Sequence, residues 1–295
     1  MDLGEPGAGE ALVQTVCSGI SSGTEMLAYR GQIDPDLPLD ASFDFGGTFS
    51  YPFRYGYSCI GQTGDGVMVF GFHPHQDRFV AREDELLHVS GVAPEVATLF
   101  PLVETALQIT LDAGPRLGER VAVTGLGTVG LLVALLLQRA GADVVASDPS
   151  AWRRSLATSL GVAAVPPDGL DGPFALLVEV SGNPDALAGG LHLLAHEGTA
   201  LVASWYGRQE ARLPLGRDFH RRRLTIRSTQ VSTIPAALSG RWDVARRRAA
   251  ALRLLGELPL DRLPTRAFRF EQAAEAFAAV DRGDEGLLHA VLCYS

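Results

Sequence analysis

The segment from Val121 to Asp148 reads VAVTGLGTVGLLVALLLQRAGADVVASD, and its order of elements decides the fold of the chain. A short apolar run at 121–124 leads into a glycine-rich turn and a helix-length apolar segment at 131–140. A second apolar run then ends at a lone acid, Asp148. Strand, Gly-x-Gly-x-x-Gly turn, helix, strand and acid, in this order, are the fingerprint of a dinucleotide-binding βαβ unit.

Each glycine of this turn has a physical role. Gly125 permits the tight turn, Gly127 lets a pyrophosphate approach the backbone, and Gly130 lets the helix pack close to the strand. The helix N-terminus supplies N–H groups and partial positive charge for phosphates. We therefore expect the turn, including Thr128 and Val129, to bind the phosphates of a cofactor.

The acid at the end of the second run indicates which cofactor is preferred. Asp148 follows the last glycine by 18 residues, a spacing that suits a hydrogen bond to a ribose 2′-hydroxyl. Its charge would repel a 2′-phosphate, which favours NAD(H). Arg153 and Arg154 follow closely, so NADP(H) stays open.

Composition excludes several classes of protein. The 295-residue chain is 46% hydrophobic and carries a net charge of −9, which argues against a nucleic-acid partner. Its three scattered cysteines fit a reducing compartment, and the apolar run at 131–137 is too short to span a bilayer. The N-terminus does not have the pattern of a signal peptide. We expect a cytoplasmic protein without a membrane partner.

The chain contains no lysine, and all 25 basic residues are arginine. Arginine stays protonated, so it neither forms Schiff bases nor serves readily as a general base. This excludes lysine-dependent aldolase or pyridoxal chemistry, the P-loop, and the Tyr-x-x-x-Lys pair of short-chain dehydrogenases.

Hydrophobic patterning divides the chain into three parts. Residues 1–93 contain short runs bounded by glycines, which predict the strands of a small barrel or sandwich. Residues 94–232 begin with helical spacing and then alternate strand and helix, which predicts a parallel, doubly wound α/β sheet. Residues 233–295 predict helices at 235–255 and 270–280 and a closing strand at 288–293. The arginine run 246–248 is expected to be a solvated helix face.

This order of parts, together with several short motifs, resembles the medium-chain dehydrogenase/reductase superfamily over nearly the whole chain. Besides the glycine fingerprint, the matching motifs are Pro6–Glu10, Ser18–Glu25, Tyr55–Gly61, Glu104–Leu107, Val180–Gly182 and Phe268–Phe277. The resemblance implies a GroES-like substrate domain built from both ends of the chain, with the Rossmann domain inserted between them. It also implies an active site in a cleft and, commonly, a homodimer. Tyr55–Cys59 and His73–Gln76 look closest to the bacteriochlorophyllide hydroxyethyl dehydrogenase-like branch.

The chain departs from the zinc-dependent members at their metal ligands. Ser22 and Tyr57 stand where the resemblance places a cysteine and a histidine ligand, and the third ligand falls at about Pro101. Serine, tyrosine and proline are not zinc ligands of the usual kind. The four-cysteine structural zinc lobe is also missing. We therefore expect a member without zinc, and His73 and His75 are expected to line the cleft or lie on the surface.

The start of the chain is a second departure, because relatives carry further residues before the Pro6–Glu10 motif. Either the start is truncated or the substrate domain is trimmed.

Without zinc, side chains must manage the proton that accompanies hydride transfer. Tyr57 is the first candidate, with Thr24 at the family's relay position and Ser22 as a third hydroxyl. Each has a simpler alternative: Tyr57 as space filler and Thr24 as a helix N-cap. Glu104 would orient one of these groups, or pair structurally with an arginine. The expected cofactor contacts beyond the glycine turn and Asp148 are Thr105, Arg153, Ser181, Ser204 and Trp205.

Three functions remain open at this point. The first is a zinc-independent alcohol dehydrogenase or ketone reductase acting on a bulky secondary metabolite. The second is an enoyl or quinone reductase, and the third is a redox-neutral or non-catalytic nucleotide-binding role. The loop at 32–53, with Phe43, Phe45, Phe49, Tyr51 and Phe53, suggests a large apolar or aromatic ligand, or alternatively a self-packed lid.

Overall fold

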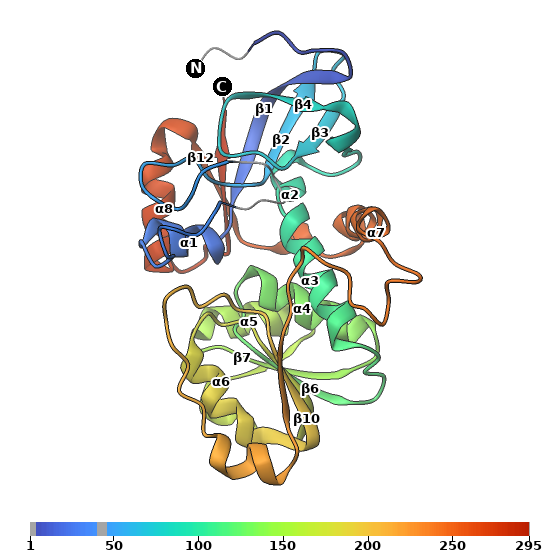
Figure 1. The fold of residues 1–295 in the computed structure, drawn as a ribbon, viewed down its shortest axis with the longest axis vertical. Coiled ribbons are helices and arrows are strands. Elements are labelled where there is room, and N and C mark those ends of the chain that lie inside the picture. Colours follow the sequence, from blue (N-terminus) through green and yellow to red (C-terminus); the bar gives the residue numbers. More distant parts are fainter. Residues whose placement is uncertain (1–3, 40–45, 295) are drawn as a thin grey trace. The chain divides into compact units, whose positions relative to one another are not determined.

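The computed structural model describes residues 4–39 and 46–294 (Figure 1). These residues form two compact units, one made of the described residues up to 101 and from 250 onward, and the other of 102–249. We call them the terminal unit and the central unit. The boundaries predicted at 93/94 and 232/233 lie earlier in the chain than those between the two units, at 101/102 and 249/250. The latter fall inside helices α3 (Phe100–Ala113) and α7 (Val244–Glu257).

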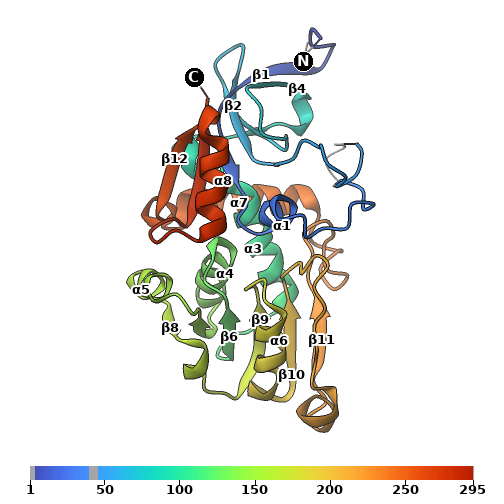
Figure 2. The ribbon, with the colours of Figure 1, turned by 90° about the vertical axis from the view of Figure 1, so that its left-hand side faces the viewer.

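The central unit is built on a six-stranded parallel sheet (Figure 2). Its strands lie in the order β11-β10-β9-β6-β7-β8. Their bounds are β6 Arg120–Thr124, β7 Asp143–Ser147, β8 Ala163–Val165, β9 Phe174–Glu179, β10 Leu194–Val202 and β11 Thr225–Ser228. Counted along the chain, this is the 3-2-1-4-5-6 order of dinucleotide-binding sheets, so the predicted doubly wound fold is confirmed.

Burial explains why these segments become parallel strands. Four of the five residues of β6 are buried, as expected for a strand covered on both faces. Helix α4 (Thr128–Arg139) packs against β6 and β7, and α5 (Ala151–Ser159) packs against β8. Helix α6 (Pro184–Gly190) packs against β9 and β10.

The terminal unit holds a seven-stranded, mostly antiparallel sheet (Figure 1). The strand order is β12-β13-β1-β2-β3-β5, and β4 also pairs with β1. Their bounds are β1 Glu10–Ile20, β2 Cys59–Thr63, β3 Met68–Gly71, β4 Arg78–Arg82, β5 Leu87–His88, β12 Thr265–Arg269 and β13 His289–Cys293. Both ends of the chain therefore contribute to one sheet, as the resemblance implied.

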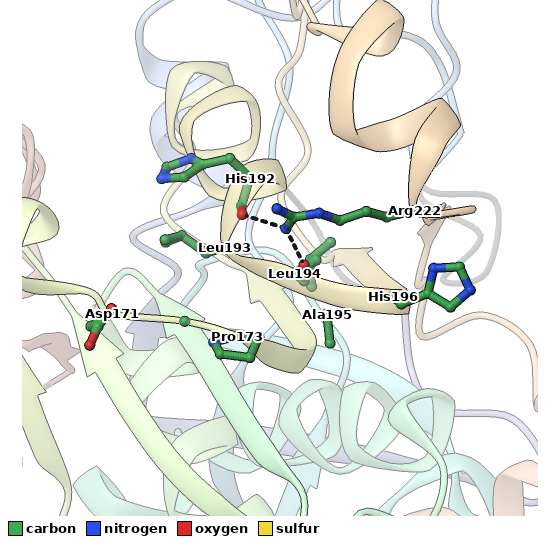
Figure 3. Close-up of a pocket in the computed structure, with 9 residues that line it drawn as sticks. Asp171, Pro173, His192, Leu193, Leu194, Ala195, His196 and Arg222 are labelled. Atoms are coloured by element: carbon green, nitrogen blue, oxygen red, sulfur yellow. Dashed lines mark hydrogen bonds between the residues drawn. The ribbon is translucent and has the colours of Figure 1, made fainter.

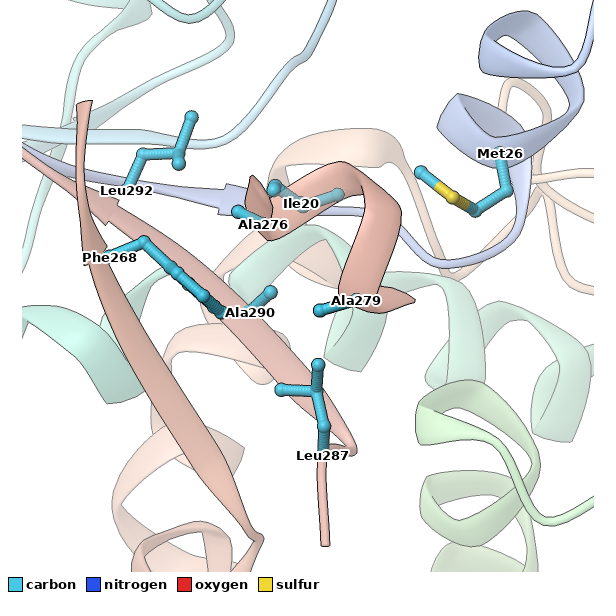
Figure 4. Close-up of a cluster of buried hydrophobic side chains, with 8 residues drawn as sticks. All are labelled: Ile20, Met26, Phe268, Ala276, Ala279, Leu287, Ala290 and Leu292. Carbon is cyan, nitrogen blue, oxygen red and sulfur yellow. The ribbon is translucent and has the colours of Figure 1, made fainter. Parts of the chain in front are cut away.

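The described part of this unit also contains the α-helices α1 (Thr24–Tyr29), α2 (Pro94–Ala97) and α8 (Ala273–Arg282). The apolar face of α8 covers the end of the sheet where β1, β12 and β13 meet, as Figure 4 shows. This cluster comprises Ile20, Met26, Phe268, Ala276, Ala279, Leu287, Ala290 and Leu292.

The predicted helix at 235–255 begins later than expected. It starts only at Val244, because residues 235–242 form turns instead. The helical stretch at 94–113 is long and apolar enough to cross a membrane, judged by length and composition alone. However, 67% of its most apolar 18 residues are buried inside the protein. Such burial is typical of a helix in a protein core.

Candidate functional site

The glycine turn has the shape that its sequence predicts. Gly125 adopts φ +99°, and a side chain there would place its Cβ 2.6 Å from the Cα of Ser181. At Gly130 a Cβ would lie 1.9 Å from the carbonyl oxygen of Gly125. Above Gly127 there is open space, with no heavy atom within 4 Å of a built Cβ. A phosphate can therefore approach the backbone at Gly127, while the flanking glycines close the turn.

The start of α4 completes this phosphate cradle. Gly127 is the N-cap residue, and no side chain caps the helix. Thr128 is buried and Val129 half-buried, so they belong to the wall of the turn. The first turn of a helix offers N–H groups and positive potential to an anion. The residues present therefore fit a dinucleotide pyrophosphate.

Asp148 follows β7 and is only 3% exposed. Its Oδ2 accepts a hydrogen bond from the N–H of Leu126 at 2.8 Å, and its Oδ1 accepts one from the N–H of Ser150 at 2.8 Å. The carboxylate thus fixes the glycine turn to the end of β7. Each oxygen keeps a second acceptor position, so a ribose hydroxyl can still bind.

Two arginines lie next to this acid. Nη1 of Arg153 is 3.7 Å from Oδ2 of Asp148, and its guanidinium lies over the ring of Trp152. Nη1 of Arg154 donates instead to the carbonyl oxygens of Asp148 and Pro149. Arg153 is therefore the arginine placed beside the carboxylate of Asp148, and a ribose contact of either residue stays a prediction.

At the end of β9 the structure shows a polar cluster that the sequence prediction missed in part. The fully buried Glu179 accepts hydrogen bonds from the N–H and hydroxyl of Ser181, at 2.8 and 2.6 Å. Its other oxygen accepts the hydroxyl of Tyr206 at 2.6 Å. Burial and this hydrogen bond raise the pKa of the Tyr206 hydroxyl. The signal in the sequence was an acid closing an otherwise apolar strand.

The predicted contacts Ser204 and Trp205 lie beside this cluster, in the segment after β10. The hydroxyl of Ser204 accepts the N–H of Gly182 at 2.9 Å, which joins the ends of β9 and β10. Trp205 is 43% exposed, and its cofactor role stays a prediction.

The predicted catalytic hydroxyls lie in two segments of the terminal unit. Ser22 is exposed, and Thr24 is the first residue of α1 and half-buried. The N-cap of α1 is Gly23, so Thr24 does not fill the capping position that was its alternative role. Tyr57 is half-buried in the segment before β2, with its ring edge-on to Tyr55 at 6.1 Å. Their catalytic roles stay predictions.

Near these residues is a buried network that the sequence prediction did not contain. Nε2 of His75 lies 2.8 Å from Oε2 of Glu25, and Nδ1 lies 2.7 Å from the hydroxyl of Ser18. That hydroxyl also contacts the hydroxyl of Tyr294 at 2.9 Å. Oε1 of Glu25 accepts the N–H of Ser21, so the network fixes the turn before α1. His75 thus joins β1, α1 and the C-terminal segment through its ring, while its side chain stays 10% exposed.

His73 is also enclosed by the protein. Its ring stacks on Phe79 at 4.0 Å, and burial lowers the pKa of His73 to about 4. Among the described residues no group of three or more His, Cys, Asp or Glu side chains could hold a metal ion.

Glu104 and Thr105 lie on α3. Glu104 is buried, and its Oε1 lies 3.0 Å from Nε of Arg247, whose Nη1 donates to Gln108 at 2.6 Å. These contacts match the structural pairing with an arginine that was the alternative for Glu104. Arg247 is only 3% exposed, so the expectation of a solvated face for the arginine run was wrong at this position. Thr105 is half-buried, and its cofactor role stays a prediction.

A pocket of about 510 Å³ lies elsewhere in the central unit (Figure 3). Its lining residues, which include His192, His196 and Arg222, gather where β9 and β10 begin. Nη1 of Arg222 donates to the carbonyl oxygens of His192 and Leu194. Because ligands of such sheets bind at the carboxyl ends of the strands, this pocket is separate from the dinucleotide cradle.

The chain is similar to known oxidoreductases both in sequence and in fold. L-threonine 3-dehydrogenase of Saccharopolyspora erythraea is 35% identical over 38% of this chain and 36% of its own length. The 2-desacetyl-2-hydroxyethyl bacteriochlorophyllide A dehydrogenase of Cereibacter sphaeroides is 26% identical over 70% of this chain and 69% of its own. Acetophenone reductase from Geotrichum candidum, solved in complex with NAD, superposes with a TM-score of 0.78 at 14% identity. That superposition covers 99% of this chain and 92% of the reductase.

The chain is similar in sequence to these dehydrogenases and in fold to solved dehydrogenases and reductases. No protein-family model matches it. The chain spans 36% to 58% of the length of the first curated relatives that it matches. The structural likeness shows that the fold of these enzymes extends over nearly the whole chain.

Proposed function

We propose that this protein is a nicotinamide-dependent oxidoreductase that transfers hydride to or from the carbon of a carbonyl group or secondary alcohol. The observation that carries the proposal is the glycine turn at the switch point of a 3-2-1-4-5-6 sheet, with Asp148 at the end of the neighbouring strand. The names of its relatives, which are dehydrogenases, support the same class of reaction. We expect the protein in the cytoplasm, and we expect it to act as a homodimer.

In this proposal the cofactor, when bound, supplies or accepts the hydride. The turn from Gly125 to Gly130 and the start of α4 would hold its pyrophosphate. Asp148 would bind the adenosine ribose and favour NAD(H) over NADP(H), with Arg153 close enough to soften that preference. Trp205 would form one wall of the nicotinamide site.

The proton would be handled by hydroxyl groups and not by a zinc-bound water. Tyr57 and Ser22 occupy the positions of zinc ligands in related enzymes, and neither is a suitable ligand. Tyr57 would donate to the substrate oxygen as negative charge develops there. Thr24 would relay the proton, and Glu25 would hold the turn that carries Ser22 and Thr24 through the N–H of Ser21.

The substrate in this proposal is bulky and apolar or aromatic. Phe49, Phe53 and Tyr55 stack edge-to-face with one another, with ring centroids 5.2–6.2 Å apart, and Phe49 is buried. The loop is thus in part a self-packed cluster, which also includes Tyr51: its ring lies 4.8 Å from that of Phe53 and is 63% exposed on the outside of the cluster. Phe43 and Phe45 of the same loop lie outside the described residues.

Three measurements on the purified protein test the proposal. Fluorescence titration with NADH and NADPH tests cofactor binding and preference, and metal analysis tests the absence of zinc. A turnover screen over bulky ketones and enones tests the reaction class. Tyr57→Phe should lower the rate with ketones at least about tenfold, since general acid help contributes about 10²–10⁴-fold. Turnover of enones alone would instead establish an enoyl or quinone reductase, and stoichiometric zinc would refute the zinc-free assignment.

A further inference from the structure

Glu179 places a buried carboxylate at the switch point of the central sheet. It is the last residue of β9 and lies in register with Thr124, the last residue of β6. These two strands are neighbours in the sheet although β7 and β8 lie between them in sequence. Dinucleotides bind across the crevice at the point where the strand order reverses in this way.

Three hydrogen-bond donors surround the carboxylate of Glu179. The N–H and hydroxyl of Ser181 donate to Oε1, and the hydroxyl of Tyr206 donates to Oε2. Glu179 is 0% exposed. A charge at a buried position is weakly screened by water, so its field reaches further than that of a surface charge.

The position of this charge relates it to one end of the cofactor. Ser181 touches the glycine turn, since a Cβ on Gly125 would meet its Cα at 2.6 Å. The strands β6 to β8 with Asp148 form the half that binds adenosine, so β9 to β11 form the half for the nicotinamide. Nicotinamide carries a positive charge when oxidised and none when reduced. A buried negative charge on this half therefore acts differently on the two redox forms.

We propose that Glu179 sets the preference of the cofactor site for the oxidised over the reduced dinucleotide. This inference rests on the proposed function. Its rival is a purely structural role, in which Glu179 only ties the turn after β9 to the segment after β10 through Tyr206.

Glu179→Gln separates the two roles because it removes the charge and preserves the shape. The amide oxygen can still accept from Ser181, and the amide nitrogen can donate to the hydroxyl of Tyr206. Dissociation constants for NAD⁺ and NADH would be measured by calorimetry for the wild type and the variant. We expect the ratio of the constant for NAD⁺ to that for NADH to rise about fivefold or more.

Two matched variants serve as controls. Tyr206→Phe removes one hydrogen bond and keeps the charge, so the ratio should stay within about twofold of the wild type. Glu179→Asp also keeps the charge and should stay close to the wild-type ratio. If Glu179→Gln does not fold, Tyr206→Lys is the alternative. It places an ammonium group next to the carboxylate of Glu179, so the pair has no net charge, and the ratio of the constant for NAD⁺ to that for NADH should again rise.

The outcomes distinguish this inference from the proposed function. If Glu179→Gln weakens the binding of NAD⁺ and NADH equally, or changes the binding of neither, Glu179 has only a structural role. The inference is then wrong, while the proposed function stands. If the wild type binds neither NAD(H) nor NADP(H) in either redox form, the proposed function fails and the inference fails with it.

Discussion

His289 makes the terminal unit sensitive to acid in a way that can be calculated. It begins β13, is 2% exposed, and its Nε2 lies 2.8 Å from the hydroxyl of Thr98. That hydroxyl donates its own proton to the carbonyl oxygen of Glu95 at 2.6 Å, so Nε2 of His289 must be the donor in the pair. The proton of an imidazolium would then go to Nδ1, which is buried and has no partner among the described residues.

Burial accordingly lowers the pKa of His289 to about 4 from its ordinary 6.5. Between these two values the unfolded chain binds a proton that the folded protein does not. The free energy of unfolding is therefore highest above pH 6.5 and falls as the pH drops toward 4. The full difference corresponds to about 3 kcal/mol, of which about 2 kcal/mol is lost by pH 5.

The assay is urea unfolding, followed by circular dichroism at pH 7.5 and pH 5.0, of the wild type and His289→Gln. Glutamine can keep a hydrogen bond to Thr98 but does not titrate. Between the two pH values the wild type should lose about 2 kcal/mol more than the variant. Other titrating groups, including His73, act in both proteins and cancel. Equal losses in the two proteins would refute the calculation.

Three further predictions concern the central unit. Arg247→Met should lower the free energy of unfolding by about 3–5 kcal/mol in chemical denaturation, because it leaves the buried carboxylate of Glu104 without its closest partner. Gly130→Ala should abolish NADH fluorescence enhancement, because its Cβ would meet the carbonyl oxygen of Gly125 at 1.9 Å; retained binding would contradict the geometry of the turn. Asp148→Asn should shift the NADH-to-NADPH affinity ratio about tenfold toward NADPH, since it removes a charge that repels the 2′-phosphate; an unchanged ratio in paired titrations would show that Asp148 only braces the turn.

The central sheet could be predicted from the sequence because its elements are local and strongly patterned. The predicted alternation of strand and helix is present as β6 to β11 with α4, α5 and α6 between them. Strand β12 was missed because Thr265–Arg269 carries two arginines and is mostly exposed, and it becomes a strand only by pairing with β13. The helix predicted from residue 235 starts at Val244, since Ser239 and Gly240 favour the turn that precedes it.

The residues of the candidate site also fall into those that local sequence predicts and those that only the tertiary fold brings together. The glycine turn and Asp148 follow from spacing along the chain, so sequence reasoning found them. The network around His75 joins Ser18, Glu25 and Tyr294, whose partners are up to 276 positions apart, and only the tertiary fold brings them together. Glu104 was a candidate for the site because it belongs to one of the matching motifs. The structure shows that its carboxylate instead accepts a hydrogen bond from the buried Arg247.

The place of β13 in the terminal sheet has a consequence for synthesis on the ribosome. β13 lies between β12 and β1 in the sheet, and it pairs with Cys17–Ile20 of β1, which is made long before it. The central unit is continuous in sequence, so it can fold as soon as residue 249 has emerged. Until β13 follows, the end of β1 offers unpaired backbone groups to any passing strand. The nascent chain thus carries a complete central unit together with an open sheet edge, and this is the state that a chaperone would need to protect.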